Sequence, residues 1–411
     1  MSGRNQHTWG PPDPSLREYA TPRQAEVLDA VLRCGSVPAA ADELGVRAST
    51  LHDRLYDLKK RAARRGWSPE HDMTHDVPEG FHLKGVSTYY GDDGKVRGQW
   101  VKTQIDREHR LEMLREELTE FAEPFAGASE FAEPPATSVE DLLCVYPLGD
   151  PHIGMYAWAQ ETGCSFDLAI AEREIVCAVD QLVELAPPAK HALIADLGDF
   201  FHSDTSDNRT LRAGNPLDID TRWPKVIRVG LRIIRRLIDR ALLKHETVRV
   251  VIEIGNHDDH SAAMLAMFLA EYYSNNPRVR VDDSPDTYHW LRFGKNLIGV
   301  THGHRVKARD LAHVMACDRA KDWGETEYRH WYTGHVHHDT LKEYPGVTVE
   351  TFRTLAPADA WHHHSGYRSG RDLKVDIWHR EYGMDTRHIV GIRRVWDALR
   401  RADANQGGEG I

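Results

Sequence analysis

Seven side chains that commonly bind divalent cations lie in five short turns of this sequence. Each turn directly follows an apolar, β-branched run, so each is expected at the carboxyl end of a β-strand. Because α/β proteins gather the carboxyl ends of their strands at one edge of a sheet, these side chains are expected to meet there. They are Asp150 and His152 in GDPHIG, Asp199 in GDFF, Asn256 in GNHDD, His302 in THGH, and His335 and His337 in GHVHH.

The chemistry of this donor set favours a pair of metal ions. A carboxylate can bridge two cations, while imidazoles and an amide oxygen complete each shell without accumulating negative charge. Two divalent ions about 3.5–4 Å apart can hold a phosphoryl group and lower the pKa of a bridging water. Oxygen and nitrogen donors without thiolate favour Mn²⁺ first, with Fe²⁺ or Zn²⁺ as alternatives, over Mg²⁺ or Ca²⁺ alone.

The cysteines do not contribute to this set. They are odd in number, scattered, and never spaced C-x-x-C, which argues against a disulfide framework or a thiolate zinc site. This pattern favours a reducing cytoplasm, that of the host cell if the chain is phage-encoded. The residues are Cys34, Cys144, Cys164, Cys177 and Cys317.

The ordered motifs D-x-H, G-D-x-x, G-N-H-D, H-G-H and G-H-x-H resemble those of the calcineurin-like metallophosphoesterase superfamily over residues 142–395. The resemblance implies an α/β fold, a β-sandwich flanked by helices, that holds two metal ions. It implies that His257 neutralises the transition state or protonates the leaving oxygen, with Asp258 orienting that histidine. It also assigns one metal to Asp150, His152, Asp199 and His337, and the second to Asp199, Asn256, His302 and His335.

Departures from the superfamily pattern indicate the subclass. Protein serine/threonine phosphatases follow their second motif with an arginine in G-D-x-V-D-R-G. The corresponding segment here reads GDFFHSDTSDNRT, which disfavours a protein phosphatase. His202 in the same segment resembles a residue of the SbcD-type repair nucleases. We expect it to contact the scissile phosphate or the metal shell, or else to cap its loop by a hydrogen bond. In WHHHSGYRSGRD, Arg368 and Arg371 either bind a phosphodiester backbone or lie on a solvated loop.

The amino-terminal part of the chain predicts a helix–turn–helix. Thr21 to Gln24 reads as a capping box with proline at the first helical position, and Gly35 and Gly45 suit helix ends. The segment AAADELGVRASTLHDRL resembles the helix–turn–helix of bacterial transcription regulators and transposase-like proteins. A three-helix bundle for protein contact is the alternative. The residues expected to contact DNA are Arg47, Ser49, Thr50, His52, Arg54 and Lys59.

A β-hairpin is predicted next, over residues 80–105. Alternating residues flank a Gly-Asp-Asp-Gly turn, and basic side chains interleave with aromatic ones. The hairpin suits either a DNA-binding wing or a ribbon that packs on the helices. Its basic residues expected at DNA are Lys84, Arg97 and Lys102.

The composition of the 411 residues is that of a globular protein, with 41% hydrophobic and 28% charged residues and a net charge of −11. No apolar run approaches the ~20 residues that a membrane span needs, and no membrane partner is expected. We expect a disordered arm over 1–20, the helix–turn–helix over 21–66, the wing over 80–105, a helical and then Pro/Ala/Glu-rich linker over 106–140, the phosphoesterase domain over 141–396, and a disordered tail over 397–411.

These features favour a dinuclear-metal phosphodiesterase that acts as a DNA exo- or endonuclease in repair or replication and is brought to DNA by its helix–turn–helix. The combination resembles predicted bacteriophage and prophage proteins. Two alternatives stay open: an enzyme for a small phosphoester or cyclic nucleotide, and a non-catalytic DNA-binding accessory protein. A homo-oligomer is also possible, through a helix such as 222–244 or the acidic segment 107–123.

Overall fold

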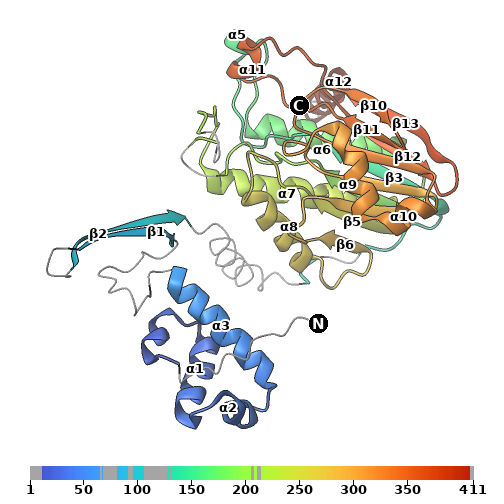
Figure 1. Ribbon diagram of the computed structural model, residues 1–411. Helices are drawn as coiled ribbons and strands as arrows, with labels where there is room; N and C mark the ends of the chain where they lie inside the picture. Colours follow the sequence, from blue (N-terminus) through green and yellow to red (C-terminus); the bar gives the residue numbers. More distant parts are fainter. Residues whose placement is uncertain are drawn as a thin grey trace. The chain divides into compact units, whose positions relative to one another are not determined.

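A computed structural model describes residues 12–64, 67, 81–90, 96–105, 127–129, 132–204, 208–210 and 214–407 (Figure 1). The chain forms two compact units, residues 1–114 and residues 115–411.

The first unit contains a small helical core. Its elements are η1 (Pro14–Tyr19), α1 (Pro22–Cys34), α2 (Val37–Leu44) and α3 (Ala48–Arg64). The expected capping box forms at α1, where the Gln24 backbone N–H donates to Thr21 Oγ1 and the Thr21 N–H donates to Gln24 Oε1. Gly35, with φ of 73°, ends α1 in the left-handed conformation that glycine adopts without strain.

The prediction of a disordered arm over 1–20 is wrong for its last residues, because Pro14–Tyr19 is a 3₁₀ helix. The Asp13 side chain caps this helix by accepting from the Ser15 N–H at 2.9 Å. Leu16 is fully buried in the same cluster as Leu28, Leu51 and Leu58. Leu16 is buried against side chains that are distant in the sequence, and this burial stabilises the turn. The residues of the turn alone do not predict such a contact.

The hairpin predicted in this unit forms from β1 (Phe81–Tyr90) and β2 (Val96–Ile105). The strands pair antiparallel, with register shifts between Leu83 and Gly85 and between Tyr89 and Tyr90. Trp100 is 63% exposed, so at least one aromatic ring of the hairpin faces solvent.

The second unit is a sandwich of two sheets, which confirms the predicted α/β sandwich flanked by helices (Figure 1). The six-stranded sheet has the order β13-β12-β3-β4-β5-β6, and the five-stranded sheet the order β10-β11-β9-β8-β7. Strands β3 to β6 run parallel, as do β8, β9 and β11. The inner faces share one apolar cluster that includes Val145, Leu193, Ile298, Val300 and Phe352.

The strands of the first sheet are β3 (Val139–Leu148), β4 (Ala189–Asp196), β5 (Thr247–Ile252), β6 (Val279–Asp282), β12 (Asp372–His379) and β13 (Gly383–Gly391). Those of the second are β7 (His289–Phe293), β8 (Asn296–Val300), β9 (Tyr328–Thr333), β10 (Thr340–Tyr344) and β11 (Val347–Thr351).

Helices cover the outer face of each sheet. The six-stranded sheet packs against α6 (Leu168–Leu185), α7 (Trp223–Leu242), α8 (Ser261–Tyr272) and α12 (Ile392–Gly407). The five-stranded sheet packs against α9 (Leu311–Asp318), which η3 (Ala308–Asp310) precedes and α10 (Ala320–Glu325) follows. Two short helices, α5 (Ala159–Thr162) and α11 (Ala360–His364), lie in loops.

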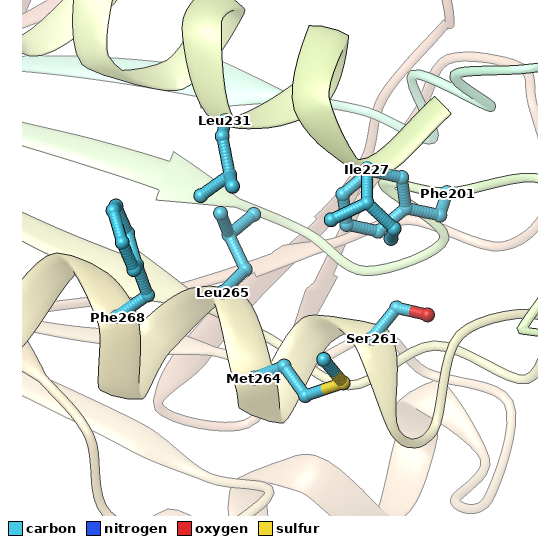
Figure 2. Close-up of a pocket in the computed structure, with 7 residues that line it drawn as sticks. All are labelled: Phe201, Ile227, Leu231, Ser261, Met264, Leu265 and Phe268. Atoms are coloured by element: carbon cyan, nitrogen blue, oxygen red, sulfur yellow. The ribbon is translucent and has the colours of Figure 1, made fainter. Parts of the chain in front are cut away.

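A pocket between α7 and α8 is lined by apolar side chains and Ser261 (Figure 2). Ile227 and Leu231 of α7 face Leu265 and Phe268 of α8 across it. This pocket offers no metal ligand, so it is an apolar seam between helices and separate from the predicted centre.

Two predicted boundaries of this unit differ from the structure. Strand β3 begins at Val139 rather than 141, and residues 127–129 already belong to the unit, since the Gly127 N–H donates to the Glu271 carbonyl at 2.9 Å. The tail predicted as disordered from 397 is helical to Gly407, because Val395 is fully buried and Arg173 pairs with Asp403 at 2.7 Å. No described helix combines the length and apolar character that a bilayer crossing requires.

A buried histidine on β7 predicts how stability depends on pH. His289 lies 3.1 Å from Glu253 and 3.5 Å from Asp282, and Asp282 also pairs with Arg249 at 2.9 Å. Burial opposes protonation, yet the two carboxylates raise the pKa of His289 to about 9. Because the pKa of His289 is higher in the folded than in the unfolded chain, protonation of His289 stabilises the folded state. This contribution is complete below the unfolded pKa of about 6.5 and is lost as pH rises through 9.

His289→Gln is therefore expected to lower the free energy of unfolding by about 1–3 kcal/mol at pH 6. Urea titrations at pH 6 and at pH 9.5 measure this difference, which shrinks at the higher pH. The exposed His313→Gln serves as the control. A loss for His289→Gln that is equal at both pH values contradicts the charged pair.

Candidate metal centre

The predicted ligands lie where five strands end at one edge of the sandwich. Strand β3 leads to Asp150 and His152, and β4 leads to Asp199. Strand β5 leads to Asn256, β8 to His302, and β9 to His335 and His337. Four of these side chains, Asp150, His152, Asp199 and His302, are at most 2% exposed.

Backbone strain concentrates at this edge. Six described residues other than glycine have positive φ, and five of them are predicted ligands. A non-glycine residue in this region costs roughly 1–2 kcal/mol, so the surrounding contacts must hold these turns. Three of these side chains, Asp150, His152 and Asp199, are buried at this edge, whereas His337 is half-buried and His335 is exposed. The five are Asp150 (44°), His152 (48°), Asp199 (53°), His335 (72°) and His337 (54°).

The first group of ligand atoms comes from Asp150, His152 and His337, which lie within 4.8 Å of one another. His152 Nε2 is 3.1 Å from His337 Nε2, and His337 Nε2 is 3.5 Å from Asp150 Oδ1. The backbone N–H of His335 donates to both oxygens of Asp150, at 2.9 and 3.0 Å, and fixes that carboxylate.

The second group comes from Asp199, His302 and His335. His302 Nε2 lies 3.2 Å from Asp199 Oδ2 and 3.2 Å from Asn256 Oδ1. Asp199 Oδ1 accepts the backbone N–H of His257 at 2.8 Å, so Oδ2 is the oxygen turned to the histidine. All seven predicted ligands thus lie in two adjoining groups.

The donor atoms of the second group fit a cation. His302 Nδ1 donates to the Leu197 carbonyl at 2.7 Å, which leaves Nε2 as an acceptor when the ring is neutral. Three acceptors, Nε2 and the oxygens of Asp199 and Asn256, then face one another and need a positive charge between them. Burial lowers the pKa of His302, but Asp199 and Asp150 outweigh it and raise the pKa to about 10. A divalent ion would displace this proton.

The electrostatics of the first group also suit metal binding. Burial, together with His337, His257 and His202, holds the pKa of His152 well below its ordinary value. The ring is therefore neutral at physiological pH, which is the form that binds metal.

His257 is oriented by a different group from the one predicted. Its Nδ1 donates to the His202 backbone carbonyl at 2.9 Å. Asp258 instead accepts the backbone N–H groups of Phe201 and Gly255, both at 3.0 Å. The prediction that Asp258 orients His257 is wrong, because both of its oxygens tie together the loops after β4 and β5. Every residue has a backbone carbonyl, so the residue types in a sequence cannot predict which carbonyl accepts this hydrogen bond.

His202 lies buried behind the first group. Its Nδ1 is 3.2 Å from His152 Nδ1, and its ring stacks on His257 with centroids 5.4 Å apart. Burial, with His257 nearby, lowers the pKa of His202 to about 3, so the ring is neutral. This position supports a predicted metal ligand, as second partners of metal-bound histidines do.

Of the two arginines predicted to bind substrate, Arg371 is committed elsewhere. Its guanidinium donates to Glu174 Oε2 at 2.6 Å and to the Leu355 carbonyl at 2.5 Å, and its side chain is 12% exposed. Breaking this buried pair would leave Glu174 uncompensated, so the prediction for Arg371 is wrong. Arg368 is exposed and donates to the His363 and Tyr367 carbonyls.

His362 lies at the centre but was not among the predicted site residues. Its ring stacks on that of His337, with centroids 4.9 Å apart, and its Nδ1 lies 2.7 Å from Asp359 Oδ1. The only signal in the sequence was the run of three histidines after Asp359.

The residues predicted to contact DNA lie in the first unit. Arg47, Ser49 and His52, before and on the first turn of α3, are exposed. Thr50, Arg54 and Lys59 are half-buried. On the hairpin, Lys84 and Lys102 are exposed, and the side chain of Arg97 falls outside the described part.

Comparison with known proteins finds no matching family model and no matching curated protein. Among solved structures, the chain is similar to Vps29 of Entamoeba histolytica complexed with zinc, at 14% identity over 61% of this chain and 99% of that one, with a TM-score of 0.27. A predicted phosphoesterase from Streptococcus pneumoniae matches at 13% identity, covering 62% and 99% of the two chains, with a TM-score of 0.25. An archaeal phosphodiesterase matches at 13% identity, covering 60% and 99%, with a TM-score of 0.30. Similarity at these TM-scores assigns no role to this chain, and the chemistry of the centre follows from its own geometry.

A glycine at the centre supplies a test of its packing. A Cβ added at Gly255 would lie 2.0 Å from Asp199 Oδ1 and 2.2 Å from the Asp199 backbone nitrogen. Gly255→Ala must therefore displace Asp199, and we expect divalent-metal affinity to fall about 10- to 100-fold. Titration calorimetry with Mn²⁺ measures it. Gly324→Ala, at a position with open space, should bind as the native chain does; equal affinities for all three proteins would contradict the assignment of Asp199.

Proposed function

We propose that this protein is a dinuclear-metal phosphodiesterase that cleaves DNA. The convergence of seven oxygen and nitrogen donors in two adjoining groups carries the proposal. Asp150, His152, Asp199 and His337 would hold one ion, and Asp199, Asn256, His302 and His335 the other. Bound divalent ions supply Lewis acidity toward the phosphoryl oxygens and lower the pKa of a water nucleophile. We propose Mn²⁺ as the native ion, because the donor set contains no thiolate.

The chain's own residues then position and neutralise the reacting group. The His202 carbonyl fixes the proton of His257 on Nδ1, and His257 is half-buried, beside His152. Nε2 is thereby left as the free ring nitrogen. When the ring carries a second proton, Nε2 would donate it to the leaving oxygen or hydrogen-bond a developing negative charge. Asp258 keeps the two loops that carry Asp199 and His257 in register.

The first unit supports DNA as the substrate. Exposed Arg47 and His52 lie at the start of α3, the second helix of the predicted helix–turn–helix, where base edges or phosphates would be met. The exposed Lys84 and Lys102 suit contact with a phosphate backbone. The five free cysteines suit action in the cytoplasm.

Replacement of the proposed proton donor tests the enzymatic part. His257→Ala is expected to lower kcat about 10²- to 10⁴-fold, on both bis-p-nitrophenyl phosphate and DNA, with Mn²⁺ present. His257 is not among the predicted ligands, but its ring nitrogen lies within 4.8 Å of those of His152 and His202. Metal content is therefore measured as well, and an unchanged content distinguishes loss of the proton donor from loss of an ion. The exposed His313→Ala is the control and should retain full activity. Native activity in His257→Ala would rule out this mechanism, and no Mn²⁺-dependent hydrolysis by the native chain would rule out the enzyme.

The DNA-binding part is tested separately. Arg47→Ala is expected to weaken binding to a DNA duplex and to reduce the slope of log affinity against log salt by about one. Fluorescence anisotropy at several salt concentrations measures both. Arg23→Ala, an exposed arginine on α1, is the matched control. Equal losses for the two variants would mean that charge alone, and not the start of α3, governs binding.

A further inference from the structure

Four large aromatic side chains are exposed in the two loops that carry α5 and α11. Large aromatic residues normally bury most of their surface, so a group of exposed rings in an ordered region indicates a binding surface. We name this group the aromatic rim. It consists of Tyr156 (43% exposed), Trp158 (50%), Trp361 (63%) and Tyr367 (40%).

The aromatic rim adjoins the metal centre. Trp361 and Tyr367 flank His362, with ring centroids 4.9 and 5.1 Å from it. His362 in turn stacks on the predicted ligand His337. Tyr156 and Trp158 follow His152 closely in the chain, and α5 lies beside α11 (Figure 1). One imidazole therefore separates the rim from the first group of ligands.

The backbone that carries these rings is held in place. The Asp359 side chain accepts the N–H of His362 at 2.8 Å at the start of α11, and the Tyr367 N–H donates to the His362 carbonyl at 3.0 Å. Ala157 pairs with Phe166 in an isolated β-bridge beside Trp158. The rings of Trp361 and Tyr367 also lie against each other, with centroids 5.9 Å apart. Rings fixed in this way lose little conformational freedom when a ligand stacks on them.

The charges around the aromatic rim are mixed. Arg368 and His364 lie on the α11 side, and His364 is 3.8 Å from Glu161 of α5. Asp218 is exposed next to Tyr156, whose N–H donates to the Asp218 carbonyl at 2.9 Å. Such a surface attracts phosphate only weakly, so its ligand must be recognised through flat aromatic faces.

We propose that the aromatic rim binds the unpaired bases of single-stranded DNA next to the phosphodiester at the metal centre. This inference rests on the proposed function and names the strand form of its substrate. Bases of a duplex are stacked and paired with one another, whereas unpaired bases offer both faces to aromatic side chains, irrespective of sequence. The rim thus selects single strands at the site of cleavage.

Binding of a labelled 20-nucleotide oligothymidylate tests the proposal. The linkages are phosphorothioates, which slow cleavage, and the full chain is loaded with Mn²⁺. Trp361→Ala and Tyr367→Ala are each expected to weaken binding about tenfold, while Trp361→Phe keeps the affinity within about threefold. The ratio between native and Trp361→Ala affinities should stay constant from about 50 to about 200 mM salt, because stacking releases no counterions.

The matched control is Tyr382→Ala. Tyr382 is 73% exposed and stacks on His379, which pairs with Leu142 at the start of β3, some 20 Å along that strand from the centre. This variant should bind as the native chain does. A duplex of equal length should bind Trp361→Ala and native protein equally, because the first unit is unchanged in both.

Three results would overturn the proposal. The native chain would bind an abasic oligonucleotide as tightly as oligothymidylate, or Trp361→Ala and Tyr382→Ala would lose equal affinity for oligothymidylate. The third is that Trp361→Ala loses as much affinity for the duplex as for oligothymidylate. Hydrolysis assays separate this outcome from the fate of the proposed function. Binding that depends on Trp361 in a chain without phosphodiesterase activity would retain the rim and reject the enzyme. Hydrolysis of DNA by a chain whose binding does not depend on Trp361 would retain the enzyme and reject the aromatic rim.

Discussion

Two carboxylates held away from water at one edge of the sandwich set the main constraint on this protein. Asp150 and Asp199 are almost completely buried, and their ion-pair partners in the described part of the chain are histidines. Isolated buried carboxylates are strongly unfavourable unless positive charge lies next to them. Despite its burial, Asp199 and Asp150 raise the pKa of His302, which shows the negative field that cations bound at this edge would neutralise.

The scaffold around the centre supplies the rigidity that this charge arrangement needs. Parallel strands bring five loops together, and five of the predicted ligands lie in turns with positive φ. Between the sheets, Arg387 bridges Asp376 and Glu350, and Asp376 also accepts the Tyr332 hydroxyl at 2.8 Å. A buried network that satisfies its charges in this way keeps the two sheets in a fixed relation. The loops after β5 of one sheet and β8 of the other can then place Asn256 and His302 within 3.2 Å.

The two units offer different kinds of surface. In the second unit, cations bound at the predicted centre would attract a phosphodiester, and exposed aromatic rings lie near it. In the first unit, exposed Arg47 and His52 lie at the start of α3. The loop with α11 carries Trp361 and Tyr367 and also His362, so a side chain that stacks on a predicted ligand and part of the proposed base-binding surface belong to one loop.

The sequence by itself determined which side chains form the centre and which strand precedes each of them. It did so because apolar runs, turns and metal-type residues are local patterns, as is the capping box at Thr21. Only the tertiary structure decided the partners of these side chains. In the folded chain, a backbone carbonyl orients His257, and Arg371 pairs with Glu174, which lies 197 residues away. The ring of His362 stacks on that of His337, and Leu16 is buried in the helical core of the first unit. Contacts between distant segments and backbone acceptors depend on how the chain packs, and a local pattern of residues contains neither.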